Sequence, residues 1–509
     1  MASSHPLATQ AGLRMLDAGG NALDAALATA IALVVVEPTG NGLGSDAFCI
    51  LWDGKELHGL NASGRSPATW SADKFAHLDG MPERGWDSVT VPGAVSAWRD
   101  LSARFGRLPF EKLFEPAIGY AEAGFMVSPV IAEQWRRGGE ILKDQPGFSS
   151  AFLPNGRAPY AGEVFRNPDM AQSLRLIAET KGEAFYRGEL AERIVAFGKA
   201  HGAALTGSDL DNHRNDWCGT IAQKFKGFEA HEIPPNGQGI AALMALGILD
   251  HLEIEDLAPE SGDAVHLQLE AMKLALADLY AYVGDLNWMK SVSVTDLLST
   301  DYLGSRAKLI DRRRAQDFGP GIPHESGTVC LATGDANGQM VSFIQSNYAG
   351  FGSGIVVPKT GISLQNRGLG FELTPGHPNR VDGSKRPFHT IIPGFVMRDG
   401  KPAMSFGLMG GAMQAQGHVQ MILRCLMWKQ DPQTAADAPR WRVVNGLSVA
   451  IEPTAGNDVI QELKQRGHQI SIEAPDESFG FGGAQIVTRV DGGYVGGSDP
   501  RKDGQVSGF

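Results

Sequence analysis

The pattern of the sequence changes at Pro323-His324-Glu325-Ser326-Gly327-Thr328-Val329-Cys330-Leu331-Ala332. Before this stretch, residues 93–315 have mostly the apolar spacing of helices, whereas short β-rich segments separated by glycine turns follow it. Residues 329–332 and 340–346 flank Asp335-Ala336-Asn337-Gly338, which predicts a β-hairpin. The stretch therefore marks the passage from a helix-rich first part of the chain to a strand-rich second part.

Thr328 stands at the start of the first of these strands, directly after Gly327. A threonine in this position can act as an N-terminal nucleophile if the chain is cut between the two residues. The freed α-amino group, whose pKa is ordinarily about 8, would then be the general base for the hydroxyl of the same residue. Threonine is also a common strand residue, so this pattern alone favours an ordinary structural role for Thr328.

Upstream, residues 5–18 predict a helix that ends at Gly19-Gly20, and Asn21 can cap a second helix over residues 22–36. The second helix is apolar on nearly all sides, which predicts that it lies between other layers of the protein. Further helices are predicted at residues 94–104, 168–180, 264–282, 413–428 and 459–466, and further strands at 48–52, before a turn at Asp53-Gly54, and at 394–397, 403–406 and 484–490. Together these elements predict an α+β fold in which helices cover the sheets.

The composition excludes several classes of function. The net charge of −12 disfavours binding to nucleic acids and to anionic membranes. Residues 22–36 are too few to span a bilayer, and no signal peptide is visible, so we expect a cytoplasmic protein. The four cysteines are far apart and lack metal-binding spacing. Although 509 residues would suit three or four domains, no linker separates independent units.

Common cofactor and catalytic motifs do not match. Gly40-Asn41-Gly42-Leu43-Gly44 has the glycine content of a dinucleotide-binding turn, but it follows a predicted helix and precedes a predicted strand, which is the wrong order. The sequence has no P-loop, no HExxH zinc motif and no GxSxG nucleophile elbow. We therefore expect neither a metal ion nor an organic cofactor.

An ordered set of motifs carries a resemblance to a known family. They are Ser3-Ser4-His5-Pro6-Leu7-Ala8, Gly19-Gly20-Asn21-Ala22-Leu23-Asp24-Ala25-Ala26, Val91-Pro92-Gly93, Pro116-Ala117, Ala121-Glu122-Ala123-Gly124-Phe125, Gly327-Thr328, Asp335-Ala336-Asn337-Gly338, Phe351-Gly352-Ser353-Gly354-Ile355, Lys385-Arg386-Pro387 and Met409-Gly410-Gly411. In this order the chain resembles the γ-glutamyltransferase family of N-terminal nucleophile hydrolases over nearly its whole length.

The resemblance implies a four-layer αββα sandwich, made as a precursor and cut autocatalytically into residues 1–327 and 328–509, which together form one structural unit. It implies that Thr328 is the nucleophile and that the Ser346 hydroxyl supports it by hydrogen bonding. The backbone N–H groups of Gly410 and Gly411 would stabilise the oxyanion. A plain turn is the alternative interpretation of the two glycines.

The sequence departs from the glutamyl-specific members where they bind the substrate. The family arginine that binds the α-carboxylate is replaced by Ser63, with Arg65 nearby, and the aspartate that meets the α-amino group is replaced by Gly370. Arg367 appears in the same segment, and a paired serine motif is replaced by His389-Thr390. These changes resemble a hydrolase branch that includes an oxamate amidohydrolase and acylases.

We expect Arg367, with Arg65, to bind a substrate carboxylate, and we assign Tyr348, Asn366, His389 and Thr390 to the same substrate site. The alternatives are structural salt bridges for the two arginines and a core position for His389.

The sequence thus predicts a self-processing threonine amidohydrolase that acts on a small amide bearing a carboxylate. A true γ-glutamyl hydrolase or transferase acting on glutathione-like donors is the nearest alternative. An unprocessed, inactive relative that serves as a binding protein is another. For the leading interpretation, the expected partners are the small-molecule substrate and the other subunit cut from the same precursor. A homo-oligomer of the two-subunit enzyme is compatible with the sequence.

Overall fold

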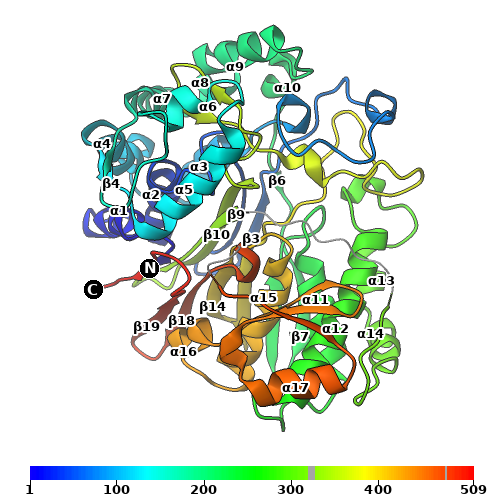
Figure 1. The fold of residues 1–509 in the computed structure, drawn as a ribbon. Helices are drawn as coiled ribbons and strands as arrows, with labels where there is room; N and C mark the ends of the chain where they lie inside the picture. Colours follow the sequence, from blue (N-terminus) through cyan, green and yellow to red (C-terminus); the bar gives the residue numbers. More distant parts are fainter. Residues whose placement is uncertain (319–326, 476–478) are drawn as a thin grey trace.

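Two antiparallel sheets lie against each other in the middle of the molecule, and helices cover their outer faces (Figure 1). This computed structural model describes residues 1–318, 327–475 and 479–509, but not the side chains of residues 327–330 and 479. The layers follow the order helix, sheet, sheet, helix. The predicted αββα architecture is therefore confirmed.

The first sheet has seven strands. In spatial order they are β20 (Gln505–Val506), β1 (Ala2–Ser3), β9 (Gly327–Gly334), β10 (Met340–Tyr348), β2 (Asp46–Trp52), β3 (Leu57–Asn61) and β6 (Asp216–Trp217). The predicted hairpin of β9 and β10 is confirmed, as is the hairpin of β2 and β3 around Asp53-Gly54. Strands from both ends of the chain are thus hydrogen-bonded neighbours in one sheet.

The second sheet has six strands. In spatial order they are β19 (Gly493–Ser498), β18 (Ala484–Val490), β14 (Lys401–Leu408), β13 (Gly394–Arg398), β8 (Phe228–Glu232) and β7 (Ile221–Phe225). The expectation of a mostly helical pattern over residues 93–315 misses β7 and β8. Each of these strands has only five residues, and their connection at Lys226-Gly227 has positive φ at both positions, which is typical of a tight hairpin.

The side chains of β2 point alternately to the two faces of the first sheet, and this explains why the two sheets stack. Phe48 and Ile50 lie between the sheets with Phe395 of β13, whereas Cys49 and Leu51 face the helices. Both faces of the strand are therefore apolar, and both are covered. A strand buried on both faces requires a layer on each side of its sheet, which is what the four-layer arrangement supplies.

One helical layer covers the first sheet. It includes α1 (Pro6–Asp17), α2 (Ala22–Val36), α3 (Ala94–Phe105), α4 (Glu115–Ala123), α5 (Pro129–Leu142) and α7 (Pro168–Glu179). Asn21 and Asp24 form a capping box at the start of α2, and every residue of α2 is buried, as predicted. Among the described helices, none is both long and apolar enough to cross a bilayer.

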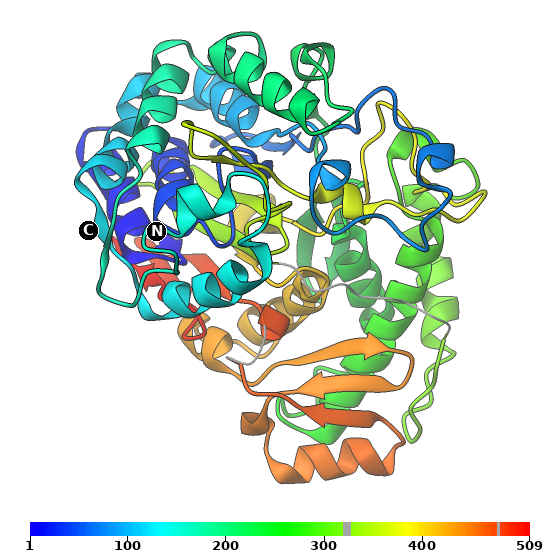
Figure 2. The same ribbon diagram turned by 45° about the horizontal axis from the view of Figure 1, so that its top comes forward.

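The other helical layer covers the second sheet. It includes α11 (Gly239–Asp250), α12 (Gly262–Tyr282), α15 (Met413–Ile422) and α17 (Asn457–Gln465). The helix predicted over residues 413–428 is α-helical only to Ile422 and continues as a π-helical turn over Leu423–Met427. Figure 2 shows a small peripheral sheet beside α17, formed by β15 (Trp441–Asn445), β16 (Ser448–Ile451) and β17 (Gln469–Ile472).

Candidate active site

The start of β9 and the end of β14 lie at the same end of the two stacked sheets. The Ser405 Oγ of β14 donates to the carbonyl of Thr333, and the Ser342 Oγ donates to the carbonyl of Phe406 at 2.7 Å. Ser342 of β10 pairs with Ala332 of β9, so Phe406 lies near Ala332 and Ser405 lies near Thr333. β14 therefore runs in the direction opposite to β9. The loop that follows β14 therefore lies toward the beginning of β9.

Thr328 is the second residue of β9, and its side chain lies outside the described residues. In the β9–β10 register, Val329 pairs with Gln345 and Gly327 pairs with Tyr348, with a bulge in β10 between them. Ser346 belongs to that bulge. The Ser346 Oγ accepts a hydrogen bond of 2.8 Å from the N–H of Tyr348, whose φ of +83° is unusual for a non-glycine residue. The bulge thus brings a buried hydroxyl to the strand position opposite Thr328.

Gly410 and Gly411 form the loop between β14 and α15, with φ of +111° and +60°. Their carbonyls accept hydrogen bonds from the N–H groups of Met413 and Gln414, both at 3.1 Å, in the first turn of α15. In the described part of the chain, neither glycine N–H donates a hydrogen bond. Two adjacent free amides at a helix N-terminus are suited to holding an anionic oxygen.

Arg367 is buried with an incomplete set of partners. Its Nη1 donates to Thr390 Oγ1 at 3.1 Å, and its guanidinium lies 4.6 Å from the centre of the Tyr348 ring. Its Nε and Nη2 have no hydrogen-bond partner among the described residues. Burial lowers the pKa of Arg367 to about 10, which leaves it charged at neutral pH. A buried guanidinium with two free N–H donors is a ready site for a carboxylate.

His389 contacts Asp46, which the sequence analysis did not identify. The His389 Nε2 lies 3.2 Å from Asp46 Oδ2, and its Nδ1 accepts a hydrogen bond of 3.4 Å from the N–H of Ile391. The proton therefore resides on Nε2. Burial and the nearby guanidinium groups of Arg367 and Arg386 hold the pKa of His389 well below its usual value, so the imidazole is neutral.

Gln238 joins the two halves of this site. Its Nε2 donates to the carbonyl of Gly411 at 2.7 Å and also to the carbonyl of Thr390. The structure thus connects the glycine loop, through Gln238 and Thr390, to Arg367. With Tyr348 and Ser346 on β10, these residues form one continuous buried cluster.

The remaining predicted substrate residues have other contacts. Arg65 is partly buried and pairs with Asp216 at 3.5 Å. Asn366 accepts from the N–H of Ala349 at 3.1 Å and donates to the carbonyl of Glu83 at 2.8 Å. Both side chains are thus engaged with the surrounding protein.

A sequence model described as gamma-glutamyltranspeptidase matches residues 8–509. The chain belongs to this family. Among curated relatives, this family member is 36% identical to the glutathione hydrolase-like YwrD proenzyme of Bacillus subtilis, over 100% of this chain and 98% of the relative. It is 35% identical to the oxamate amidohydrolase proenzyme of Klebsiella pneumoniae, over 99% and 97% of the two chains.

Among solved structures, the crystal structure of a cephalosporin acylase from Bacillus halodurans superposes with a TM-score of 0.95 at 47% identity, over 100% of this chain and 95% of that one. The predicted resemblance is therefore confirmed, and the γ-glutamyltranspeptidase-family member described here is an enzyme.

Two residues of this γ-glutamyltranspeptidase-family site were missed by sequence reasoning. Asp46 follows Gly44-Ser45 and opens the otherwise apolar strand β2, and a carboxylate at the start of a buried strand is a signal that could have drawn attention. Gln238 carries no comparable signal, because it lies just before the apolar helix α11 and its role depends on two distant carbonyls.

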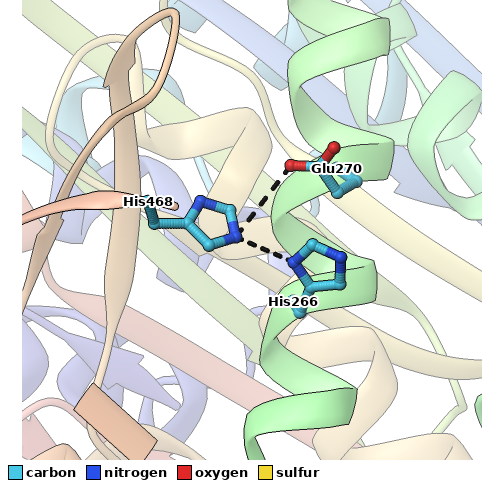
Figure 3. A group of neighbouring side chains, drawn as sticks. All are labelled: His266, Glu270 and His468. Carbon is cyan, nitrogen blue, oxygen red and sulfur yellow. Dashed lines mark hydrogen bonds and ion pairs between the residues drawn. The ribbon is translucent and has the colours of Figure 1, made fainter. Parts of the chain in front are cut away.

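A second buried polar cluster lies away from this γ-glutamyltranspeptidase-family site, on α12 and after α17 (Figure 3). The His266 Nε2 lies 2.8 Å from the carbonyl of Asp311, and its Nδ1 lies 2.8 Å from His468 Nε2. The Lys273 ammonium lies 2.7 Å from Glu270 Oε1 and 3.4 Å from His468 Nδ1. Lys273 donates to His468 Nδ1, His468 Nε2 donates to His266 Nδ1, and His266 Nε2 donates to the carbonyl of Asp311. Lys273 also supplies the cation that neutralises Glu270.

This polar cluster holds the segment before residue 319. The Lys273 Nζ also donates to the carbonyl of Gln316 at 3.1 Å, and the Gln316 N–H donates to Glu270 Oε2 at 3.1 Å. The N–H of Ala315 donates to the carbonyl of Arg466 at 2.7 Å. Residues 311–316 are therefore held by hydrogen bonds both to α12 and to the chain that follows α17.

Proposed function

We propose that this enzyme cuts itself between Gly327 and Thr328 and then hydrolyses the amide bond of a small substrate that carries a carboxylate. The observation that carries the substrate class is the buried Arg367 guanidinium, whose Nε and Nη2 find no hydrogen-bond partner within residues 1–318, 327–475 and 479–509 as described. An acid would supply the missing acceptors with the bidentate geometry that guanidinium groups prefer.

The chemistry assigned to Thr328 requires three groups. After the cut, the α-amino group of Thr328 removes the hydroxyl proton, and the hydroxyl oxygen attacks the amide carbonyl. The free N–H groups of Gly410 and Gly411 hold the oxyanion, and Ser346 orients the nucleophile by hydrogen bonding. The protonated α-amino group then gives this proton to the amine, which leaves as the C–N bond breaks. Water hydrolyses the remaining ester on Thr328, so the nucleophile, the base and the oxyanion donors all come from the chain.

The cut at Gly327–Thr328 would use the same hydroxyl but not the same base, because the nitrogen of Thr328 is still part of the peptide bond. The Thr328 hydroxyl would attack the Gly327 carbonyl, and the resulting ester would be hydrolysed to leave residues 1–327 and 328–509. The relatives named above as proenzymes support this order of events. Residues 311–316, which the buried polar cluster holds by hydrogen bonds, end eleven residues before Gly327.

The backbone at Gly370 favours a substrate without an α-amino group. A Cβ on this residue would lie 2.4 Å from the carbonyl oxygen of Phe388, so an acidic side chain that could meet an ammonium group does not fit there in this backbone.

Denaturing electrophoresis with mass determination tests the processing step. The purified protein should give pieces of 327 and 182 residues, and the Thr328→Ala variant should remain a single chain without activity. A wild-type chain that stays intact on incubation would instead favour the inactive binding-protein alternative. A Thr328→Ala variant that matures normally would show that the nucleophile is another residue.

A substrate panel tests the specificity. Ammonia release from oxamate and related acid amides should exceed release of aniline from a γ-glutamyl anilide. If the γ-glutamyl compound is turned over faster, and Arg367→Ala leaves that rate unchanged, the glutathione-hydrolase alternative is correct and the carboxylate site is wrong.

A further inference from the structure

Asp46 is a fully buried carboxyl group at the first position of β2. It pairs in register with Ser346, so it lies in line with the bulge that faces the start of β9. Its Oδ1 accepts hydrogen bonds of 3.1 Å from the N–H groups of Gly64 and Gly93, and its Oδ2 accepts one from His389 Nε2. Both lone pairs of Oδ1 are thus used, whereas Oδ2 keeps one lone pair free.

Among the described residues, few charged or titratable side chains surround Asp46; in the processed enzyme the proposed α-amino group of Thr328, opposite Ser346, is a further titratable group. Arg367 and Arg386 are the cations that act on its carboxyl group, and His389 is neutral. Tyr186 of α8 (Glu183–Tyr186) is buried with its pKa raised by burial, so it is also neutral. The Arg386 guanidinium is paired with Asp216 and with the carbonyl of Ser63. Asp46 is therefore the anion that balances the unpaired charge of Arg367.

A carboxylate bound to Arg367 would upset that balance. With Asp46 ionised, the buried site would hold two anions for one unpaired guanidinium, and burying an uncompensated charge costs several kcal/mol. Taking up one proton restores neutrality. His389 cannot accept it, because its Nε2 carries a proton and its Nδ1 faces the N–H of Ile391. The free lone pair of Asp46 Oδ2 can accept it.

We propose that Asp46 is the specificity-determining partner of Arg367: it takes up a proton from solvent when a monocarboxylate binds, and it thereby makes acid binding proton-linked. The inference rests on the proposed carboxylate site and adds the group that compensates its charge. Burial raises the pKa of Asp46 to about 7, so Asp46 is mostly ionised at mildly alkaline pH and must take up a proton there when the acid binds.

Titration calorimetry with pyruvate tests this inference on the processed enzyme. Pyruvate has the shape of oxamate but no amide bond to cleave. At pH 8, runs in two buffers of different ionisation enthalpy should show uptake of close to one proton per pyruvate bound. The affinity should fall about tenfold per pH unit above the pKa of Asp46. Infrared difference spectra should show a new protonated-carboxyl band.

Asp46→Asn should bind pyruvate without proton uptake, without the band and without the pH slope. The matched control is Glu232→Gln, which removes another buried carboxylate paired with a histidine, because Glu232 Oε1 lies 2.6 Å from His418 Nδ1. Uptake should persist in that variant. Wild-type binding with no proton exchange between pH 6 and pH 9 would overturn the inference even if Asp46→Asn fails to fold.

The proposed function fails in a different way. If Arg367→Met binds pyruvate as tightly as the wild type, or if the wild type binds none, the carboxylate site itself is wrong. If Arg367→Met loses binding while the wild type binds without proton exchange, the site stands and only the role of Asp46 is refuted.

Discussion

Arg367 donates through Nη1 to Thr390 Oγ1 at 3.1 Å, whereas its Nε and Nη2 have no hydrogen-bond partner in the part of the chain that the structure describes. The Arg367 side chain is 1% exposed, so water can accept few of the hydrogen bonds that its Nε and Nη2 could donate. Buried unsatisfied donors are costly. Their persistence here is understandable if a ligand completes the set, and this relationship is the basis of the first prediction.

Arg367→Met should raise the KM for an acid amide by roughly 10- to 100-fold, because hydrogen bonds to a charged group contribute about 1.5–3 kcal/mol. Steady-state kinetics on the processed enzyme measures the change. Arg65→Met is the matched control: it removes a half-exposed guanidinium that pairs with Asp216 and should alter KM less than threefold, as expected of a surface ion pair. Equal effects of the two substitutions would contradict the assignment.

Gly410→Ala should lower kcat by roughly 10²- to 10³-fold, because a Cβ there would lie 2.9 Å from Gly482 Cα and would displace the amide pair. The control is Gly400→Ala. Gly400 also has a positive φ, +70°, but it lies in the β13–β14 turn with open space around it. That variant should lose about 1–2 kcal/mol of stability and keep its turnover. Unchanged kcat in a folded Gly410→Ala enzyme would remove the oxyanion role.

Ser346→Ala should slow both maturation and turnover by at least about tenfold, because it removes the hydroxyl opposite Thr328 and leaves the N–H of Tyr348 unpaired. Band intensities over time measure maturation, and the matured fraction is then assayed. Ser342→Ala tests the specificity of the effect, since it deletes another buried hydroxyl of β10 that donates to Phe406. Only stability should suffer in that control.

The buried polar cluster of His266, Glu270, Lys273 and His468 should make the stability of the enzyme sensitive to acid. Burial lowers the pKa of His468 to about 2 and also lowers that of His266, whereas both are about 6.5 in an unfolded chain. Their contribution to stability is therefore complete above pH 6.5 and declines as the pH falls, by about 1 kcal/mol per unit for each histidine. The urea midpoint of His468→Gln should decline less between pH 6.5 and 5.5 than that of the wild type, with parallel behaviour from pH 7.5 to 8.5.

The helices and hairpins with strong periodicity could be predicted from the sequence. The α1–α2 pair and the β9–β10 hairpin combine a regular apolar pattern with local stop signals, so local physics determines them. The β7–β8 hairpin was missed, because its five-residue strands are stabilised by pairing with β13, more than 160 residues away. Such short strands depend on tertiary contacts that a local pattern does not contain.

Candidate residues of the site could be named where a motif marks them and not where two distant segments meet. Gly410, Gly411 and Arg367 were proposed from their motifs, and their catalytic and binding roles remain predictions. Asp46 was missed, because its importance depends on the β2–β10 register and on a contact with His389, 343 positions away. The sequence assigned Arg367 and Arg65 to one substrate site, whereas in the structure Arg65 pairs with Asp216 and is partly exposed, and Arg367 is buried.

The alternation of strands in the two sheets has a consequence for the life of the enzyme after maturation. β9 and β10 lie between β1 and β2, so strands from before and after the Gly327–Thr328 junction are interleaved in the first sheet, and in the second sheet β13 and β8 are hydrogen-bonded neighbours across that division. The two products of a cut at this junction could separate only by breaking both cores. Dilution should therefore not release them from the folded enzyme. Because unfolding would free two chains, the melting temperature of the processed enzyme should rise with its concentration, whereas that of an uncut Thr328→Ala chain should not.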